Sequence, residues 1–321
     1  LTSGEGTITA TVTVHDETGL FAGIPAGAWL LTVGVDCQDD RLEVQVLAWG
    51  DGFQVWSIEY IVINGDTSTP QPYEELYEYL FGDKSNRGLP ISVVCFDSGG
   101  HNTDMVYRFC KQHAGRKVFA VRGRPHPGRP VASRPSRKNK YGVKLYSIGT
   151  DTAKFQIHGQ FKVTAPGPGR VWLRADYDAE YFKQLAAEEV RNVRVRGYEV
   201  KQWVQVYERN EALDTWVYAY AGLMILGGDR AIAYAKKKVL AGRSEASAAP
   251  EPGDELIVSR NGKFADAFDK KMEALWDAQD AADGAAKASA PAPVPTPPPA
   301  KPKALAKPQR VKVGGWSATR F

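Results

Sequence analysis

Three apolar runs follow one another between residues 29 and 63 of the 321-residue chain. The run over 29–36 is almost continuously apolar, which is typical of a strand that is buried on both faces. Residues 42–49 alternate apolar and polar positions, and Asp51-Gly52 forms a turn before the third run over 53–63. Three successive runs joined by short turns predict an antiparallel meander.

Beyond this meander the pattern alternates between helices and strands. Helical spacing predicts five helices, over 73–81, 104–113, 151–160, 178–189 and 210–226. Further apolar runs predict strands over 91–96, 118–121 and 144–148, and a hairpin is predicted over 190–207. The helix before residue 91 allows the strand at 91–96 to lie parallel beside the first strand. The expected fold class is therefore α/β, a mixed sheet of a three-strand meander plus parallel strands, flanked by helices.

The two ends of the chain differ in composition from this middle part. Residues 1–28 are polar and Gly-rich and read as a connector, and residues 229–283, with a weak helical pattern at 264–280, as a helical extension. Residues 284–308 are mainly Ala, Pro and Lys and hold eight of the twenty prolines, so we expect a disordered linker. Trp316 and Phe321 return after it, which predicts a docking tail over 309–321.

Cysteine usage and motifs exclude several classes of protein. Three cysteines are too few for a disulfide framework, and no window reaches the roughly 18 apolar residues of a membrane span. The chain has no G-x-x-x-x-G-K-[ST] phosphate loop, so we do not expect it to be an ATPase. Because residue 1 is Leu and no signal peptide follows, we interpret the sequence as a piece of a longer polypeptide.

The distribution of charge indicates a polyanion as partner. The formal net charge is +4, yet residues 105–150 hold twelve Lys or Arg and no Asp or Glu. An acidic body with one basic segment, within which residues 122–140 are expected to form an exposed loop, predicts a strip that binds phosphates. The alternative that 105–150 is an ordinary solvated segment stays open. The expected phosphate contacts are Arg122, Arg124, Arg129, Arg134, Arg137, Lys138, Lys140 and Lys154.

Three acids occupy positions where burial of a charge is unfavourable. Asp36 and Asp97 each end a buried strand, and Asp214 lies within an apolar helix. If the two strands are neighbours, their carboxyl ends meet at one edge of the sheet, where the helix could add the third acid. Mg²⁺ prefers carboxylate, water and phosphate oxygens. This constellation predicts two-metal hydrolysis of a phosphodiester.

Asp39, Glu211 and His101 are candidates for outer positions of such a site. Each of the three principal acids also has a structural explanation: a turn acid for the first, an Asx-turn for the second, and for Asp214 an ion pair with Arg209 or another base. A serine nucleophile at Ser98 is disfavoured because no G-x-S-x-G elbow surrounds it.

Several stretches, taken jointly, resemble the nuclease half of lambda-type phage terminase large subunits. They are Leu31–Glu43, Phe96–Thr103 with Val106-Tyr107, Gly149–Lys154, Pro166–Gly169 and Asn210–Tyr218. The resemblance covers roughly residues 29–228. It implies an RNase H-like nuclease domain, with metal-binding acids that match Asp36, Asp97 and Asp214.

The resemblance also implies a biological setting, in which the enzyme cuts concatemeric viral double-stranded DNA during packaging in the host cell cytoplasm. Two Mg²⁺ or Mn²⁺ ions would be the cofactors. The implied partners are an ATPase motor before Leu1, a small terminase subunit, and the portal or procapsid, the natural receiver for Trp316 and Phe321. Two alternatives stay open: another RNase H-like DNA enzyme of the resolvase or transposase type, and a non-catalytic DNA-binding module of a packaging complex.

Overall fold

The computed structural model describes residues 20–21, 23–82, 87–100, 102–135, 139, 141–195 and 198–247. Some predictions concern residues outside this description. They are the connector over 1–19, the helix at 264–280, the linker at 284–308, the docking residues Trp316 and Phe321, and His101, Arg137, Lys138 and Lys140. The domain limits drawn from composition stay predictions.

One mixed sheet organises the described part of the chain, with eight strands in the order β10-β5-β4-β3-β6-β7-β9-β8. The strands are β3 Ala28–Cys37, β4 Arg41–Gly50, β5 Val55–Asn64, β6 Ile91–Asp97, β7 Val118–Gly123, β8 Ala132–Ser133, β9 Leu145–Ile148 and β10 Val171–Trp172. Strands β3, β4 and β5 pair antiparallel, whereas β6, β7 and β9 continue the sheet in parallel from β3. This order confirms the predicted mixed, RNase H-like sheet.

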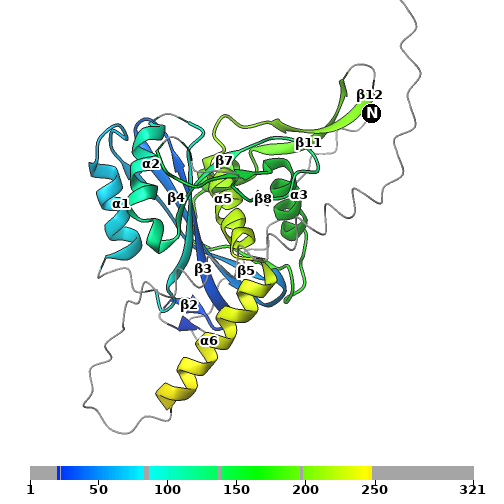
Figure 1. Cartoon of the computed structure of the whole chain (residues 1–321). Helices are drawn as coiled ribbons and strands as arrows, with labels where there is room; N and C mark the ends of the chain where they lie inside the picture. The colour runs from blue at the N-terminus through cyan, green and yellow to red at the C-terminus, as the bar shows by residue number, and fades with distance from the viewer. Residues whose placement is uncertain are drawn as a thin grey trace, which may run out of the picture. The chain divides into compact units, whose positions relative to one another are not determined.

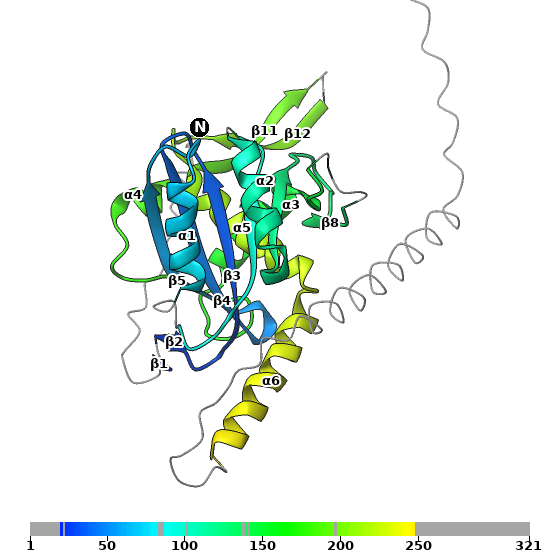
Figure 2. The same ribbon diagram turned by 60° about the vertical axis from the view of Figure 1, so that its left-hand side comes forward.

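Helices cover both faces of this sheet, as Figures 1 and 2 show. The helices are α1 Gln71–Phe81, α2 Thr103–Gln112, α3 Thr150–Phe161, α4 Ala179–Leu185, α5 Glu211–Ile225 and α6 Asp229–Ser247. Helices α1 and α2 pack one apolar core against β3, β4 and β6, and α5 lies in a second core on the opposite face with α3 and α4. The central strands are therefore buried on both sides, as their apolar runs predict. No helix in the described ranges is long and apolar enough to cross a membrane.

Helix α5 approaches strand β3 closely at Gly34. A Cβ atom at this position would lie 1.9 Å from the carbonyl oxygen of Thr215 and 2.7 Å from the backbone nitrogen of Ala219, so the contact requires glycine. Residues two apart on a strand share a face, so Asp36 lies on the face that α5 covers. The close contact thereby brings Asp214, the residue before Thr215, towards Asp36.

An antiparallel hairpin extends from the body between α4 and α5 (Figure 1). It consists of β11 Glu188–Val195 and β12 Tyr198–Gln205, and it confirms the hairpin predicted over 190–207. The helix predicted over 178–189 is wrong in its last turn, since α4 ends at Leu185. Glu188 instead pairs with Gln205 in the hairpin register, so strand pairing overrides the local helical pattern.

Two further features differ from the expectations. The loop predicted over 122–140 is shorter, because β7 continues to Gly123 and β8 pairs with β9. In β4, the alternating polar residues Glu43 and Gln45 are completely buried, although alternation suggests a solvent-facing side. They lie under α4 and α5, where the Tyr181 hydroxyl donates to Gln45 Oε1 at 2.8 Å. A buried polar layer therefore replaces solvent on this face.

Candidate active site

The three acids predicted to bind metal come from three elements that meet at one end of the sheet. Asp36 is the penultimate residue of β3, Asp97 is the last residue of β6, and Asp214 lies in the first turn of α5. Strands β3 and β6 are parallel neighbours, so their carboxyl ends share an edge. The sheet order thus places Asp36 and Asp97 as the sequence predicts.

Burial and mutual repulsion disfavour negative charge on these acids. Asp36 is 6% exposed and Asp97 is 9% exposed, whereas the Asp214 side chain keeps 24% of its surface in contact with solvent. Burial raises the pKa of Asp36 well above its usual range, and repulsion from Asp214 and Asp97 raises it further. Burial also raises the pKa of Asp97, and raises that of Asp214 to about 6. A cation between them would reverse this effect.

The Asp97 carboxylate has an unsatisfied oxygen. Burial raises its pKa, while the backbone N–H groups of Gly99 and Ser98 and the Tyr218 hydroxyl stabilise the charged form. These backbone contacts agree with the Asx-turn explanation of the residue. Its Oδ1 atom is nevertheless buried without a hydrogen-bond partner. A buried carboxylate oxygen without a donor is suited to a cation.

Lys154 of α3 occupies the side of the site next to Asp214. Its Nζ atom lies 2.5 Å from Glu188 Oε1 and 3.5 Å from Asp214 Oδ1. The Asn210 side chain joins the same two acids, donating to Glu188 Oε1 at 3.0 Å and to Asp214 Oδ2 at 3.1 Å. Burial lowers the pKa of Lys154, but attraction by Asp214 and Glu188 outweighs it and the net shift is upward. Lys154 therefore stays positively charged.

This placement of Lys154 differs from the exposed phosphate contact expected from the sequence. The side chain is buried, because its charge is matched inside the fold rather than presented to solvent. A contact of Lys154 with DNA stays a prediction. Sequence reasoning missed Glu188 altogether, since it fell in the helix expected over 178–189. The base next to Asp214 is Lys154, which agrees with the expected ion pair with Arg209 or another base, whereas Arg209 pairs with Glu43.

The carboxylates of Asp36, Asp97 and Asp214 are the kind of ligand that a divalent cation prefers, but they do not converge on one position. Within the described ranges, no group of three or more His, Cys, Asp or Glu side chains is close enough to hold a metal ion. The electrostatic coupling of Asp36 with both Asp214 and Asp97 still places the three in one neighbourhood. Like charges without a cation repel each other. Hard oxygen donors, raised pKa values and the orphaned Asp97 Oδ1 together favour Mg²⁺ or Mn²⁺.

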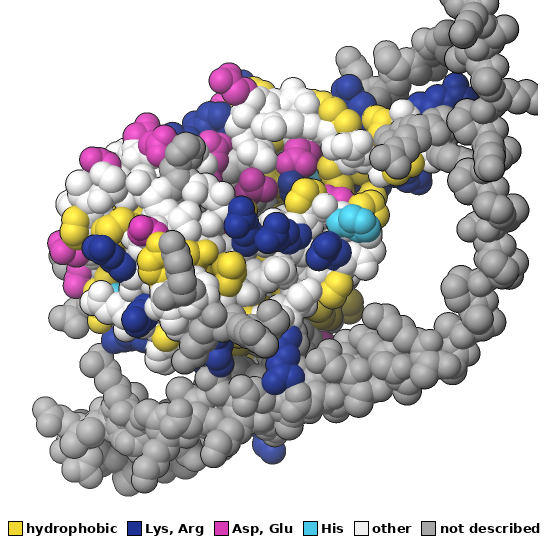
Figure 3. Space-filling view, turned by 45° about the horizontal axis from the view of Figure 1, so that its top comes forward, with side chains coloured by type: hydrophobic (Ala, Val, Ile, Leu, Met, Phe, Trp, Pro, Cys, Tyr) yellow, Lys and Arg dark blue, Asp and Glu magenta, His cyan; other side chains and the backbone are white. Residues whose placement is uncertain are grey.

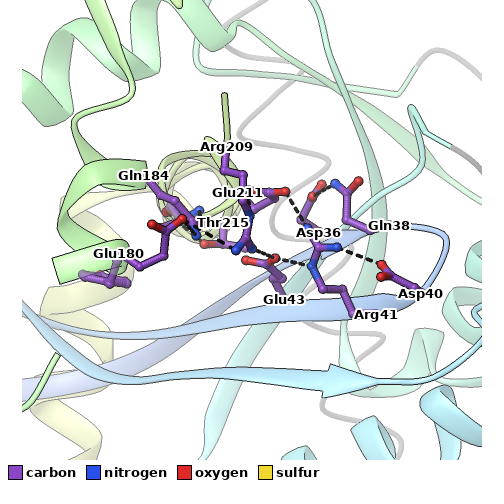
Figure 4. Close-up of polar contacts among 12 residues, drawn as sticks. Asp36, Gln38, Asp40, Arg41, Glu43, Glu180, Gln184, Arg209, Glu211 and Thr215 are labelled. Atoms are coloured by element: carbon purple, nitrogen blue, oxygen red, sulfur yellow. Dashed lines mark hydrogen bonds and ion pairs between the residues drawn. The ribbon is translucent and has the colours of Figure 1, made fainter. Parts of the chain in front are cut away.

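A second group of acids beside Asp36 is matched by arginines, as Figure 4 shows. Arg41 Nε lies 2.6 Å from Glu43 Oε1, and Arg209 Nη2 lies 2.6 Å from the same oxygen. The two arginines also reach Glu211, through Arg41 Nη2 at 2.7 Å and Arg209 Nε at 3.3 Å. We call these four residues the Glu43 network. Glu211, a candidate for an outer position, is thus engaged by two permanent cations.

The remaining predicted residues that the structure describes lie on the surface. Asp39 is exposed in the turn between β3 and β4, and its outer role stays a prediction. Four of the predicted phosphate contacts have exposed side chains: Arg122, Arg124, Arg129 and Arg134. On the face of the molecule that Figure 3 presents, Lys and Arg side chains gather near acidic ones. Burial is the largest effect on the pKa of Asp97 and raises it, and three hydrogen bonds oppose this rise. The positive charge of Arg122 opposes it too, as a smaller effect.

Comparisons with solved structures give only distant likenesses. One is to Thermus thermophilus RuvC, with a TM-score of 0.30 and 10% identity over 60% of this chain and 92% of that one. Another is to a mutant nuclease domain of the large terminase subunit gp2 of bacterial virus Sf6, with manganese and beta-thujaplicinol. Its TM-score is 0.36, with 12% identity over 68% of this chain and 94% of that one. These scores are too low to carry an argument.

The sequence comparisons are much stronger. The terminase large subunit of Escherichia phage lambda is 37% identical over 214 residues, 64% of this chain and 33% of that protein. The terminase large subunit of Enterobacteria phage P21 is 33% identical over 216 residues, 64% of this chain and 34% of that protein. The chain thus spans about a third of the length of these curated relatives. A model of the endonuclease domain of terminase large subunit gpA matches residues 4–233, more than half of the sequence, so this chain belongs to that family.

Proposed function

We propose that this chain is a metal-dependent endonuclease that cuts concatemeric viral double-stranded DNA for genome packaging, in the cytoplasm of the host cell. Family membership supports a terminase over the resolvase or transposase alternative. The observation that supports the metal dependence is the coupling of three acids from β3, β6 and α5, two of them buried and one partly buried, whose pKa values are all raised. Acids whose pKa values are strongly shifted by burial and by neighbouring charges are typical of functional sites.

Asp36, Asp97 and Asp214 would hold the two Mg²⁺ or Mn²⁺ ions. When bound, such ions activate water and stabilise the charge that develops on the attacked phosphate. Gln38 orients the first ligand, because its Nε2 atom donates to Asp36 Oδ2 at 2.5 Å. Lys154 holds Asp214 from the other side, and Arg122 adds positive charge next to Asp97, where a phosphate would enter.

DNA would approach across the exposed arginines of the 122–134 segment, since sequence-independent affinity for a duplex comes mainly from phosphate contacts. An ATPase motor, a small terminase subunit and the portal or procapsid are the proposed partners in packaging. Support for them comes from the family match and from the relatives' designation as terminase large subunits.

Nicking of supercoiled plasmid by the 321-residue chain tests the proposal. We expect relaxed and linear products with Mg²⁺ or Mn²⁺ and none in chelator. An Asp97→Asn protein, purified identically, controls for a contaminating nuclease and should be inactive. DNA binding without cleavage in either metal would contradict the proposal and favour a non-catalytic DNA-binding module.

A further inference from the structure

The Glu43 network lies between two of the proposed metal ligands, although the proposed chemistry does not use it. Asp36 and Glu43 stand directly opposite each other in the β3–β4 register. Opposed residues of an antiparallel pair lie on one face, with Cβ atoms about 4.5–5.5 Å apart. The charge of Glu43 also reaches Asp36, where it is the last of several effects that raise the pKa. One end of the network is therefore adjacent to Asp36.

The other end of the network is the start of helix α5. Glu211 is the first residue of this helix, and Asp214 follows three residues later, so the two lie on adjacent positions of one turn. The ion pairs of Glu211 with Arg41 and Arg209 attach this turn to strand β4. A shift of the turn would move Asp214 with respect to Asp36.

The four residues close into a ring of alternating charges. Each arginine contacts both glutamates: three of the contacts are hydrogen-bonded ion pairs at 2.6–2.7 Å, and the fourth, from Arg209 Nε to Glu211 Oε2 at 3.3 Å, is an ion pair without a hydrogen bond. Glu43 is completely buried and also accepts a hydrogen bond from the Tyr60 hydroxyl. A guanidinium is planar and permanently charged, so it can bridge two carboxylates at a fixed separation, which an ammonium does less well. Such a ring is suited to setting a distance.

We propose that Arg41 and Arg209 are positioning residues that set the separation of Asp36 and Asp214 for cation binding. They act through Glu43 on β4 and Glu211 on α5, and neither arginine contacts the metal or the DNA phosphate. This inference rests on the proposed function, because it concerns the same metal site.

Positioning and simple electrostatics predict opposite results for one substitution. Arg209→Met removes a positive charge near the acids, so electrostatics alone would strengthen cation binding. If the ring positions the ligands, the same change weakens binding, by about tenfold, the lower end of the usual effect of residues that orient metal ligands. Arg209→Lys keeps the charge but loses the two-carboxylate bridge, and it should weaken binding similarly.

The measurement is Mn²⁺ binding to the 321-residue chain without DNA, followed by the electron paramagnetic resonance signal of free Mn²⁺. Arg174→Met and Arg174→Lys are matched controls, since Arg174 forms a similar pair with Asp176 on the surface. Those controls should bind Mn²⁺ as the unsubstituted chain does. Plasmid nicking should show the same order, with the activity of Arg209→Lys restored by about tenfold more Mn²⁺. Thermal unfolding and DNA affinity, both in chelator, report the fold.

Should Arg209→Met fail to fold, Arg209→Lys and Arg41→Lys decide the matter, because each keeps the buried Glu43 next to a cation. Mn²⁺ affinities of both lysine variants within twofold of the unsubstituted chain would overturn the inference. Tighter binding by a folded Arg209→Met would also overturn it. Both results leave the proposed function intact, whereas an unsubstituted chain that binds no Mn²⁺ and cuts no DNA would overturn the proposed function itself.

Discussion

Two groups of acids lie side by side where β3, β4 and α5 meet, and they differ in how their charge is matched. Glu43 and Glu211 contact two arginines from the chain itself at 2.6–3.3 Å. Asp36, Asp97 and Asp214 have weaker partners: Gln38 at Asp36; backbone donors, the Tyr218 hydroxyl and the charge of Arg122 at Asp97; and Asn210 with one lysine, 3.5 Å away, at Asp214. Arginines of the chain balance the negative charge of the first group, whereas the second group keeps an excess of negative charge.

This difference shows why burial of acids is not by itself a sign of a metal site. A buried acid with a permanent cation beside it is structurally satisfied, and breaking such a pair is costly. The pKa of Asp36, by contrast, is raised by burial and by the charges of other acids, and it is a glutamine, Gln38, that opposes this rise. The unmatched group is the better candidate for an external cation, and the comparison can be tested by changing each group separately.

The largest effect on activity is expected at the unmatched acids. Asp36→Ala, Asp97→Ala and Asp214→Ala should each reduce plasmid nicking by more than about 10⁴-fold, and double variants should be little worse than single ones, because the ligands act as a unit. DNA affinity in chelator should stay close to normal.

Asp39→Ala is the matched control for these three substitutions. Asp39 is exposed in the turn after β3, so its loss should have a much milder effect on nicking. Near-normal Mn²⁺-dependent cleavage by any of the three alanine variants would remove that acid from the site.

The contact on which both groups depend is the approach of α5 to Gly34. Gly34→Ala would place a Cβ atom 1.9 Å from the Thr215 carbonyl oxygen, so helix and strand must separate. We expect a loss of about 3 kcal/mol in the free energy of unfolding, the upper end for overpacking, measured by urea denaturation. Gly115→Ala is the control, since a Cβ there meets nothing within 4 Å. Equal stability of the two variants would show that α5 can shift freely.

The unmatched acids should also lower stability when no metal is bound. Because burial raises the pKa of Asp214 to about 6, the folded chain binds a proton there at a pH where the unfolded chain does not. Its contribution therefore favours folding as the pH falls from 7 towards 4. A shift of one pKa unit corresponds to about 1.4 kcal/mol. In chelator at pH 7.5, Asp214→Asn should therefore raise the free energy of unfolding by about 1–2 kcal/mol.

This advantage of Asp214→Asn should shrink as the pH is lowered to 5, because the native acid then takes up a proton itself. His158 acts in the opposite direction, since burial lowers its pKa to about 4 and its protonation opposes folding. The difference between the two proteins at each pH, from urea denaturation, therefore isolates Asp214. A difference that is absent at pH 7.5 or grows as the pH falls would contradict the assignment.

The smallest effect is expected on the exposed basic segment. Replacing Arg122, Arg124, Arg129 and Arg134 by Gln should flatten the dependence of log K on log salt by about 0.9 for each lost phosphate contact. Replacing four basic residues of α6, namely Arg230, Lys236, Lys237 and Lys238, provides a comparison of equal charge. An unchanged slope in the first variant, with binding retained, would show that the segment does not contact DNA.

The sequence predicted those parts of the fold that depend on local pattern. Apolar runs identified β3 and β6, and Asp36 and Asp97 followed from their position at the strand ends. The burial of Glu43 could not be predicted, because an alternating strand looks the same whether solvent or a polar layer under a helix covers its second face. Its partners Arg41 and Arg209 are separated by 168 positions in the sequence, and no local pattern connects them.

Glu188 illustrates the same limit within the site. It is the first residue of a hairpin whose strands are mostly polar, so no apolar period marks where the helix ends and the strand begins. Only the pairing with Gln205 fixes its position beside Lys154. The resemblance to terminases implies the same three acids, but a matched motif carries no information on which neighbouring cation each acid receives.

The late position of α5 in the chain has a consequence for the order of assembly. Asp36 is made early and Asp214 more than half a chain later, and contacts between such distant residues form slowly during folding. A ribosome-bound chain that lacks residues 211–225 can pair β3 with β4 but cannot bring the third acid to them. The cutting activity proposed above therefore requires that this helix has been made and has docked.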